Sequence, residues 1–450
     1  MIKDELDLDG RPNLNLASFV GTYMEREAEA LMIENISKNM SDADEYPAMM
    51  DIHARCIPII GNMWGAQKGQ HPIGIATTGS SEAIHLGGLA MKRRWQEKRE
   101  REGKDKSKPN IIMGANAQVA LEKFARYFEV EARILPVSKK SHYRLDPDLG
   151  RENIDENTIG VFVILGSTYT GQYEPVEEIS KTLDDYEAKT GNHIPIHVDA
   201  ASGGFIAPFT HAKAGFKWNF ENPRVCSINT SSHKFGLVYA GLHYLGGTEE
   251  SYTINFSQPG AQIIAQYYNL IHVGFDGFRS VMENSMANAR LLSKSLEATG
   301  WYVCISDIHR PKGQFEFNPA KEVWHKEGET SADYNAGLPV VAFTFSDQFK
   351  DYSHIKQESN YPLPPNEEKI EILRVVVRES MSLDLLDRLI TDICVVTQQM
   401  MDTDLTDLQV WQPGQTSLEK QHQSLGKNAH HRKKHGSQRP MSEGVHRSVC

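Results

Sequence analysis

The sequence predicts an α/β protein built on a doubly wound, mostly parallel sheet. Between residues 110 and 201, short apolar runs alternate with amphipathic segments of helical period, which is the rhythm of β–α–β units. The run TIGVFVILG (158–166) is apolar without alternation, as expected for a strand that is covered on both faces. Ligands of such sheets bind beyond the carboxyl ends of the strands, so functional residues should directly follow these runs.

The predicted strands and helices follow one another along the chain. The strand-like runs are NIIMG (110–114), EARILPV (131–137), TIGVFVILG (158–166), IPIHVDAA (194–201) and RVCSIN (224–229). Helical periodicity covers residues 117–128 and 176–191, and the second helix should end at Gly191 because glycine is a common C-terminal cap. A long helix should open at TTGSSEA (77–83) and run to about Glu102.

The composition of the flanking segments predicts the domain organisation. Residues 1–50 are polar and helical, as in an arm or a subunit contact, and residues 51–300 hold the large sheet. Residues 301–410 form a smaller α/β unit, in which VVAFTF and ILRVVV are predicted strands that precede a terminal helix. Residues 411–450 lose periodicity and are rich in Gln, His, Lys and Ser, so we expect a disordered tail.

Composition and charge exclude several classes of protein. The 450 residues are 40% hydrophobic and carry a formal net charge of −11, which does not favour a nucleic-acid partner. The five cysteines are scattered without a CxxC pair, which predicts free thiols and no metal site. The first residues lack the apolar core of a signal peptide, and no apolar run approaches the roughly 20 residues of a membrane span. We therefore expect a cytoplasmic protein with no membrane partner.

Two charged residues follow predicted strands. Lys234, in TSSHKFG (230–236), comes after RVCSIN, and a lysine at the end of a buried strand costs free energy unless it is neutralised or covalently occupied. Asp199, in HVDAASGGF (197–205), ends another strand beside small residues that would let a flat group approach. Alone, Asp199 would be a turn acid at a strand end. An acid and a lysine on separate strands suit a cofactor that needs both a covalent amine and a charge partner.

Pyridoxal phosphate has these requirements. Its aldehyde forms a Schiff base with a lysine amine, and a buried carboxylate keeps its ring nitrogen protonated. Its phosphate needs an anion site, which the helix N-terminus at TTGSSEA would supply through Ser80 and Ser81. An ordinary N-cap by either serine is the alternative interpretation of that motif. Together, the hydroxyls, Asp199 and Lys234 indicate a pyridoxal-phosphate enzyme.

Six motifs carry a more specific resemblance. In chain order they are TTGSSEA, FARYF, GSTYTG, HVDAASGGF, SSHKFG and INFSQPG. Together they resemble the glutamate decarboxylase family, which are group II pyridoxal-phosphate decarboxylases of fold type I, from about residue 4 to residue 400. The resemblance implies a pyridoxal-phosphate-binding large domain with a mixed, mostly parallel sheet, and a small C-terminal α/β domain. It also implies decarboxylation of L-glutamate to 4-aminobutyrate (GABA) and CO2, by a homo-oligomer that is built from dimers.

The resemblance also implies roles at matching positions. The implied catalytic residues are Lys234 at the Schiff base, Asp199 at the pyridinium nitrogen and His233 beside the lysine. The implied cofactor contacts are Ser80, Ser81 and Ser231 at the phosphate, Ser257 at the phosphate from the partner subunit, Gln118 against the ring face and Thr168 near the ring hydroxyl or Asp199. The implied substrate contacts are Arg374 at the α-carboxylate, and Ser18, Phe19, Asn39 and Asp42 at the distal carboxylate.

Each of these residue types also has a plain structural interpretation. Arg374 could form a strand-end salt bridge. Gln118 and Thr168 could be surface or cap residues, and His233 could be a hydrogen-bonded core histidine. Phe19 could be an ordinary core residue.

Two places in the chain are shorter than the family pattern. After Leu242 the family continues with a strand, a turn and another strand before YLGGT, whereas this chain runs directly into HYLGG. The second gap lies between residues 346–360 and YPLPP. We therefore expect one or two strands to be missing, including a core strand of the large sheet beside the lysine. Because this would leave neighbouring strands unpaired, we expect poor folding or weak cofactor binding.

Three alternatives follow from the substrate site, the gaps and the tail. The chain could be another fold-type-I decarboxylase or carbon–carbon lyase that acts on a different amine, or a non-catalytic chain that pairs with a full-length subunit. The basic run KNAHHRKKH (427–435) follows Trp411, as in the calmodulin-binding tails of plant members of the family. It lacks a clear amphipathic helix, so we favour a solvated tail over calmodulin binding.

Overall fold

The computed structural model describes residues 2–7, 9–21, 23–41, 43–66, 69, 72–211, 215–247, 253–316, 328–347, 361–362 and 371–402. The strands are β1 (Ile73–Thr77), β2 (Asn110–Gly114), β3 (Glu131–Leu135), β4 (Thr158–Ile164), β5 (Ile196–Asp199), β6 (Val225–Ser231), β7 (His243–Gly247), β8 (Tyr302–Cys304), β9 (Val340–Phe345), β10 (Tyr361–Pro362) and β11 (Glu371–Val376). The helices are α1 (Ile2–Leu6), α2 (Arg26–Glu34), α3 (Pro47–Met63), α4 (Ser80–Arg101), α5 (Val119–Tyr127), α6 (Pro147–Asn153), α7 (Val176–Thr190), α8 (Ala207–Thr210), α9 (Ser232–Phe235), α10 (Ala261–His272), α11 (Gly274–Ala298) and α12 (Leu383–Asp402).

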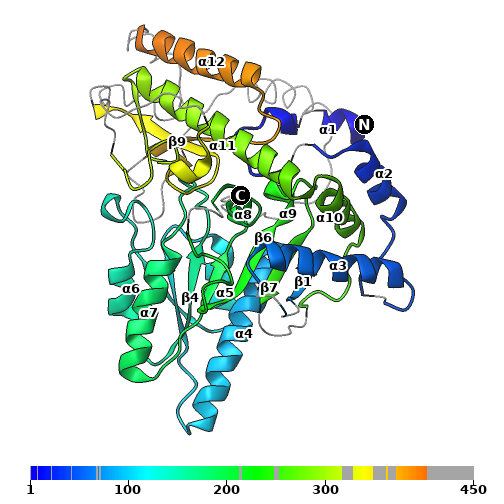
Figure 1. Cartoon of the computed structure of the whole chain (residues 1–450), viewed down its shortest axis with the longest axis vertical. Helices are drawn as coiled ribbons and strands as arrows, with labels where there is room; N and C mark the ends of the chain where they lie inside the picture. The colour runs from blue at the N-terminus through cyan, green and yellow to red at the C-terminus, as the bar shows by residue number, and fades with distance from the viewer. Residues whose placement is uncertain are drawn as a thin grey trace, which may run out of the picture.

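The large sheet has seven strands in the order β1–β7–β6–β5–β4–β2–β3 (Figure 1). Strands β2 to β6 pair in parallel, and β7 lies antiparallel between β6 and β1. The predicted α/β fold with a mixed, mostly parallel sheet is therefore confirmed. Helix α7 ends as predicted, because Gly191 adopts the left-handed conformation (φ 72°) that caps a helix at low cost.

Both faces of this sheet are buried, which explains the continuous apolar run of its central strand. In β4, Phe162 and Ile164 pack into a cluster with Phe124 of α5. Val161 and Val163, at the alternating positions, belong to the main core on the other face. Successive side chains of a strand point to opposite faces, so a strand that is covered on both sides can be apolar at successive positions.

A second, antiparallel sheet of four strands has the order β10–β11–β9–β8. Helix α11 packs against β8, β9 and α12, and Figure 1 shows α11 and α12 at the end of the molecule away from the C-terminal end of α4. One buried cluster contains both Val163 of the large sheet and Val341 of the small sheet. The domain boundaries at residues 50, 300 and 410 therefore stay predictions.

The expectation that a core strand of the large sheet is missing is wrong. Residues His243–Gly247 form β7 soon after Lys234, and they pair along one edge with β6 and along the other with β1. Five residues are enough because strands in globular proteins are commonly about 5–6 residues long. The neighbours of β7 are consequently hydrogen-bonded. The second gap, the tail 411–450 and its basic run lie outside the described residues.

In the parts of the chain that the structure describes, every helix is too short or too polar to cross a bilayer.

Candidate active site

Lys234 lies on α9, a single helical turn that directly follows β6. Its ammonium group donates a hydrogen bond to Ser202 Oγ at 3.1 Å and lies 5.2 Å from the centroid of the Phe19 ring. Ser202 comes three residues after the end of β5. The contact therefore joins the carboxyl ends of two neighbouring parallel strands, where ligands of α/β sheets bind.

Asp199 is the last residue of β5 and is 3% exposed. Its Oδ1 accepts hydrogen bonds from the Ala201 amide at 3.1 Å and from Asn229 Nδ2 at 2.9 Å. Asn229 Oδ1 in turn contacts His197 Nε2 at 2.8 Å, and Ser227 Oγ contacts His197 Nδ1 at 2.7 Å. Because an amide oxygen only accepts, His197 carries its proton on Nε2. Burial lowers the pKa of His197, which favours a neutral imidazole. This neutral imidazole holds Asn229, and Asn229 in turn holds the Asp199 carboxylate.

The glycines after Asp199 serve chain packing. A Cβ atom on Gly203 would lie 2.3 Å from the Leu165 carbonyl oxygen, and one on Gly204 would lie 2.5 Å from Thr230 Oγ1. Neighbouring segments leave no space for a side chain at either position, so the packing of the chain requires glycine at both. The sequence-based expectation that they admit a flat ligand is not supported at these two positions.

The hydroxyls of Ser80 and Ser231 form a polar pair at the start of α4, with their Oγ atoms 2.6 Å apart. The N-cap of α4 is Gly79, which has no side chain, so the interpretation of Ser80 or Ser81 as an ordinary N-cap is wrong. Ser81 lies in the same first turn and is exposed. The unpaired amides and dipole of a helix N-terminus favour an anion, and here two hydroxyls are added to them.

Four buried polar atoms on the segments around Lys234 have no hydrogen-bond partner among the described residues. They are Ser18 Oγ, Ser232 Oγ, His233 Nδ1 and His243 Nδ1. Burial, with a smaller contribution from the charge of Lys234, lowers the pKa of His233 to about 4. A buried polar atom without a partner costs about 1–3 kcal/mol, so this concentration indicates that a polar group binds here.

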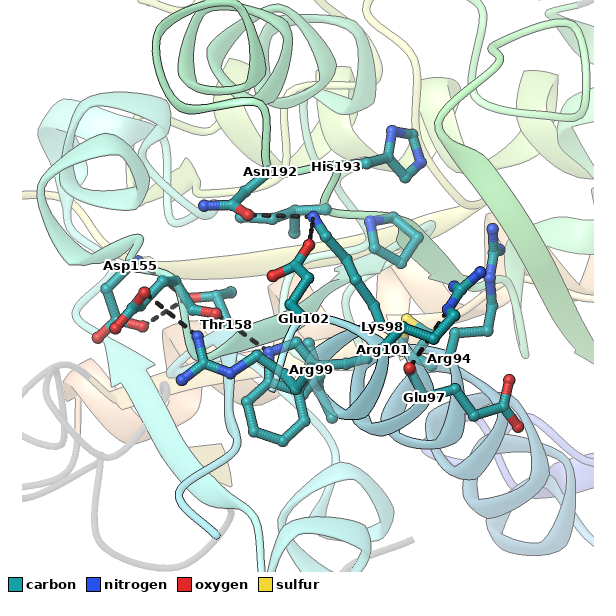
Figure 2. Close-up of a pocket in the computed structure, with 16 residues that line it drawn as sticks. Arg94, Glu97, Lys98, Arg99, Arg101, Glu102, Asp155, Thr158, Asn192 and His193 are labelled. Atoms are coloured by element: carbon teal, nitrogen blue, oxygen red, sulfur yellow. Dashed lines mark hydrogen bonds and ion pairs between the residues drawn. The ribbon is translucent and has the colours of Figure 1, made fainter. Parts of the chain in front are cut away.

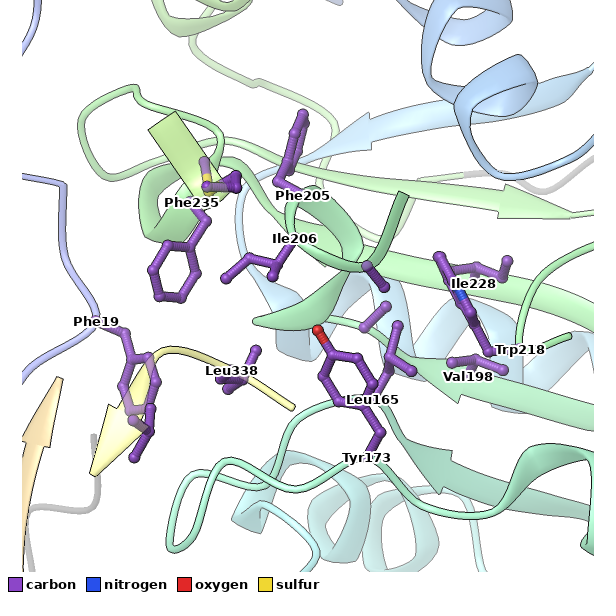
Figure 3. Packing of buried hydrophobic residues seen from close by; sticks show 14 of the residues in the cluster. Phe19, Leu165, Tyr173, Val198, Phe205, Ile206, Trp218, Ile228, Phe235 and Leu338 are labelled. Carbon is purple, nitrogen blue, oxygen red and sulfur yellow. The ribbon is translucent and has the colours of Figure 1, made fainter. Parts of the chain in front are cut away.

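The ring of Phe19 lies close to two cations. The Lys234 ammonium and the Arg374 guanidinium each lie 5.2 Å from the centroid of its ring. Phe19 is 6% exposed and belongs to the same buried cluster as Phe235 and Leu338 (Figure 3). Phe19 is therefore a core residue, as its residue type suggests. Its ring also lies close to Lys234 and Arg374, and its role in substrate binding stays a prediction.

Arg374, Thr168 and Gln118 are linked in one chain of contacts. The two terminal nitrogens of Arg374, on β11, donate to the backbone carbonyls of Thr168 and Ala17. Gln118, at the N-cap of α5, donates from Nε2 to Thr168 Oγ1. Thr168 is 4% exposed, so its interpretation as a surface residue is wrong. The contacts of Arg374 reach from the small sheet to the loop after β4 and to the N-terminal segment.

The N-terminal segment is fixed across the site by backbone contacts. Arg378, two residues after β11, donates to the carbonyls of Val20 and Pro12. The Gly21 amide donates to the His233 carbonyl at 2.6 Å, and a Cβ atom on Gly21 would lie 3.2 Å from that oxygen. Glycine is therefore needed where the segment passes next to α9. These contacts hold the segment in the position in which the Phe19 ring lies beside Lys234.

Asn39 and Ser257 form a separate pair. Asn39 Nδ2 donates to Ser257 Oγ at 3.3 Å, and Asn39 Oδ1 accepts from the Gln258 amide at 3.0 Å. The structure thus joins these two predicted site residues to each other. Asp42, the remaining predicted substrate contact, lies outside the described residues.

Sequence reasoning missed several residues that hold the site together. Ser202, Asn229, His197, Arg378 and His243 all contact a predicted site residue or its segment. One of them had a readable signal, since strand periodicity places Asn229 on the same face as Ser227 and Ser231. The others make contacts between segments that are distant in sequence.

A polar pocket of about 260 Å³ lies away from these residues, at the C-terminal end of α4 and beside the amino ends of β4 and β5 (Figure 2). Lys98 donates to Asn192 Oδ1 at 3.0 Å and lies 4.0 Å from a carboxylate oxygen of Glu102. Arg99 pairs with Glu156 at 3.2 Å. The charged groups of this pocket are thus largely paired with one another.

Comparisons with known proteins agree with this geometry. Residues 2–246 match the pyridoxal-dependent decarboxylase conserved domain. A glutamate decarboxylase of Saccharomyces cerevisiae is 45% identical over 445 residues, covering 87% of this chain and 75% of the relative. A glutamate decarboxylase of Petunia hybrida is 42% identical over 430 residues, covering 89% and 80%. The solved structure of Lactobacillus brevis glutamate decarboxylase has 33% identity and a TM-score of 0.77, covering 90% of this chain and 92% of its own.

Proposed function

Because this chain belongs to the glutamate decarboxylase family, we propose that it converts L-glutamate into 4-aminobutyrate and CO2 with pyridoxal 5′-phosphate as its cofactor. One observation carries the proposal beyond the family match. Lys234, the buried Asp199 carboxylate and the Ser80–Ser231 pair all lie at one edge of the large sheet, where the carboxyl ends of β5 and β6 meet the start of α4.

The residues present fit pyridoxal phosphate. Lys234 supplies the amine, Asp199 supplies an oriented carboxylate for the ring nitrogen, and Ser80 with Ser231 supplies hydroxyls for the phosphate. The buried atoms without partners, such as Ser232 Oγ and His233 Nδ1, lie on the segment that carries Lys234. A polar cofactor would satisfy such atoms, whereas an empty core would leave them unpaired. When bound, pyridoxal phosphate supplies the electron sink for the electron pair of the breaking Cα–carboxylate bond.

The chain's own residues bind, orient and move protons around that centre. Asp199 would hold the proton on the ring nitrogen, and the hydrogen bonds that it accepts from Asn229 and the Ala201 amide fix the direction of the carboxylate. Ser202 orients Lys234, and either the Lys234 Nζ or a nearby acid would deliver the proton that Cα takes up after CO2 leaves. The net change is that the Cα–carboxylate bond breaks and a Cα–H bond forms.

Substrate selection falls to the residues around Phe19. Arg374 can bind a substrate carboxylate through its planar guanidinium, which pairs with carboxylates better than lysine does. The Lys234 ammonium and the Arg374 guanidinium each lie 5.2 Å from the centroid of the Phe19 ring, so Phe19 would contact a substrate that reaches both groups. Orientation of the substrate decides which bond to Cα breaks, so these contacts position the α-carboxylate for loss as CO2.

The test is turnover by the purified full-length chain, supplied with pyridoxal phosphate. We expect CO2 and 4-aminobutyrate in equal amounts from L-glutamate, and turnover of L-aspartate and L-tryptophan that is at least about a hundredfold slower, because a site built to bind a particular polar substrate rejects poorly matched ones strongly. Preferential turnover of either alternative substrate would support another fold-type-I decarboxylase. The first of the two gaps no longer supports the non-catalytic alternative, because β7 pairs with both of its neighbours in the sheet.

We further propose a homodimer in which the loop around Ser257 contacts the partner subunit. Support comes from Phe256 and Ile254, whose side chains are 83% and 51% exposed beside Ser257. Large apolar side chains at this exposure mark interaction surfaces when they cluster. Light scattering of the purified chain should give the dimer mass, and Phe256→Asp should shift it toward the monomer. A monomeric parent protein would contradict the proposal.

We also propose a cytoplasmic location. Cys56 and Cys394 are free thiols, as expected in a reducing compartment. Fractionation of cells that express the tagged chain tests this proposal, and recovery in the secreted fraction would contradict it.

A further inference from the structure

Strand β7 brings a polar side chain to the phosphate corner that none of the sequence motifs predicted. His243, the first residue of β7, is paired in register with Ser231 on β6 and with Thr77 on β1. Ser231 is a member of the hydroxyl pair with Ser80, and Thr77 ends the strand that leads into α4. The backbone of His243 therefore lies between the two strands that build the candidate anion site.

The ring of His243 lies on the site side of β7 and has bonding capacity to spare. His243 is 5% exposed, and its Nδ1 has no partner among the described residues. The ring is hydrogen-bonded to the Thr78 backbone and lies 4.8 Å, centroid to centroid, from the ring of His233. The next side chain, Tyr244, points to the opposite face, where it packs in the main core.

The charges around this ring favour an anion. Burial is the main cause that lowers the pKa of His243. His233 and Lys234 on α9 lower it further. The carboxylate of Glu82, in the first turn of α4, already accepts hydrogen bonds from the amides of Thr78 and Ile254. Burial and the neighbouring cations disfavour the protonated form of His243. A bound dianion would favour that form, because its negative charge would stabilise a protonated ring beside the lysine.

We propose that His243 is an additional phosphate-binding residue, which donates a hydrogen bond from Nδ1 to the phosphate of pyridoxal phosphate beside Ser80 and Ser231. The inference rests on the cofactor proposed above. It assigns a function to the short β7: the same five residues that close the sheet also complete the anion site. This contact adds to the serines that sequence motifs assigned to the phosphate.

The test compares pyridoxal phosphate with pyridoxal, which lacks the phosphate. Both are titrated into the cofactor-free full-length chain and followed by visible absorption. In His243→Phe we expect the dissociation constant of pyridoxal phosphate to rise about tenfold, as for a lost hydrogen bond to a charged group, and that of pyridoxal to change less than about twofold. Tyr244→Phe, on the other face of β7, is the matched control and should change neither constant.

Each outcome bears on one proposal only. Equal losses for both ligands in His243→Phe, or no loss for either, would overturn the phosphate contact. Failure of the parent chain to bind either ligand would instead overturn the cofactor proposal. His243→Asn keeps an amide donor near the position of Nδ1, and we expect it to recover most of the affinity for pyridoxal phosphate.

A second measurement does not depend on folding of the His243 variants. Sulfate keeps a constant double negative charge near neutral pH, so it is the probe, and its binding to the cofactor-free His233→Asn chain is followed by thermal shift. Because the ring takes up a proton when the anion binds, we expect sulfate affinity to rise at least about threefold between about pH 7.5 and pH 5.5. Sulfate binding that is independent of pH in this variant would overturn the proposal.

Discussion

The two ends of the large sheet carry polar groups in opposite states. At the carboxyl ends of β5 and β6, buried polar atoms such as Ser232 Oγ and His233 Nδ1 have no partner among the described residues. At the other end, the pocket of Figure 2 contains charged groups that are exposed or paired, such as Lys98 with Asn192 and Arg99 with Glu156. Unpaired buried atoms are costly, and a polar ligand bound at the carboxyl ends of β5 and β6 would satisfy those that lie there. The candidate active site is therefore distinguished by buried polar atoms that lack hydrogen-bond partners, and not by the presence of charged groups alone.

Substitution of Lys234 should have the largest effect. Lys234→Ala removes the amine that a pyridoxal-phosphate enzyme needs, so we expect glutamate turnover to fall at least about a thousandfold and the visible absorption of the bound cofactor to disappear. Spectra and turnover of the variant and the parent chain are compared at matched protein concentration. A variant that keeps both properties would show that the functional lysine lies elsewhere.

Asp199→Asn should be the next most severe change. The amide cannot hold a proton on the ring nitrogen, so we expect turnover to fall about a hundredfold or more, as when a preorganised charge is removed from a site. Cofactor binding should persist, because Lys234 and the serines are unchanged. Asp184→Asn, on the exposed side of α7, is the control. Nearly unchanged turnover in Asp199→Asn would exclude its role at the ring nitrogen.

Arg374→Gln should act mainly on substrate affinity. Loss of the guanidinium removes a charged partner for a substrate carboxylate, and we expect the KM for glutamate to rise about tenfold to a hundredfold. Initial rates over a range of glutamate concentrations separate KM from kcat. An unchanged KM would favour a purely structural role, in which Arg374 holds the carbonyls of Thr168 and Ala17.

The stability of the cofactor-free chain should depend on His233. Its folded-state pKa is lowered to about 4 from 6.5, so its contribution to stability is present above pH 6.5 and is lost as pH falls through about 4. The slope is at most roughly 1.4 kcal/mol per pH unit for this histidine. Urea unfolding at several pH values should show a shallower decline for His233→Asn than for the parent chain. Parallel declines would contradict the burial of a neutral ring.

The opposite end of the sheet should give the smallest effect. Lys98 is one third exposed and contacts Asn192 and Glu102, so Lys98→Ala should lower the free energy of unfolding by no more than about 1 kcal/mol. Glutamate turnover should stay within about twofold of the parent chain. A large loss of turnover would break the comparison, because it would place a functional site at both ends.

Much of the fold could be predicted because it depends on local pattern. The apolar run of β4 indicated a strand that is covered on both faces. Gly191 indicated the end of α7, because glycine readily adopts the left-handed conformation of a C-terminal cap. The prediction failed at β7, where a comparison of lengths suggested a missing core strand. Strand pairing is a long-range property, so the sequence could not show that His243–Gly247 would pair with both neighbours.

For the site, the sequence by itself determined the reactive groups: Lys234, Asp199 and the serines each follow a strand or open a helix in a recognisable motif. The tertiary structure alone decided their environment. Asn229 orients Asp199, Ser202 orients Lys234, and Phe19 reaches the site from a segment more than two hundred residues away in sequence. The physical reason is that motifs record local chain geometry, whereas burial and hydrogen-bond partners are set by which distant segments the packed core brings together.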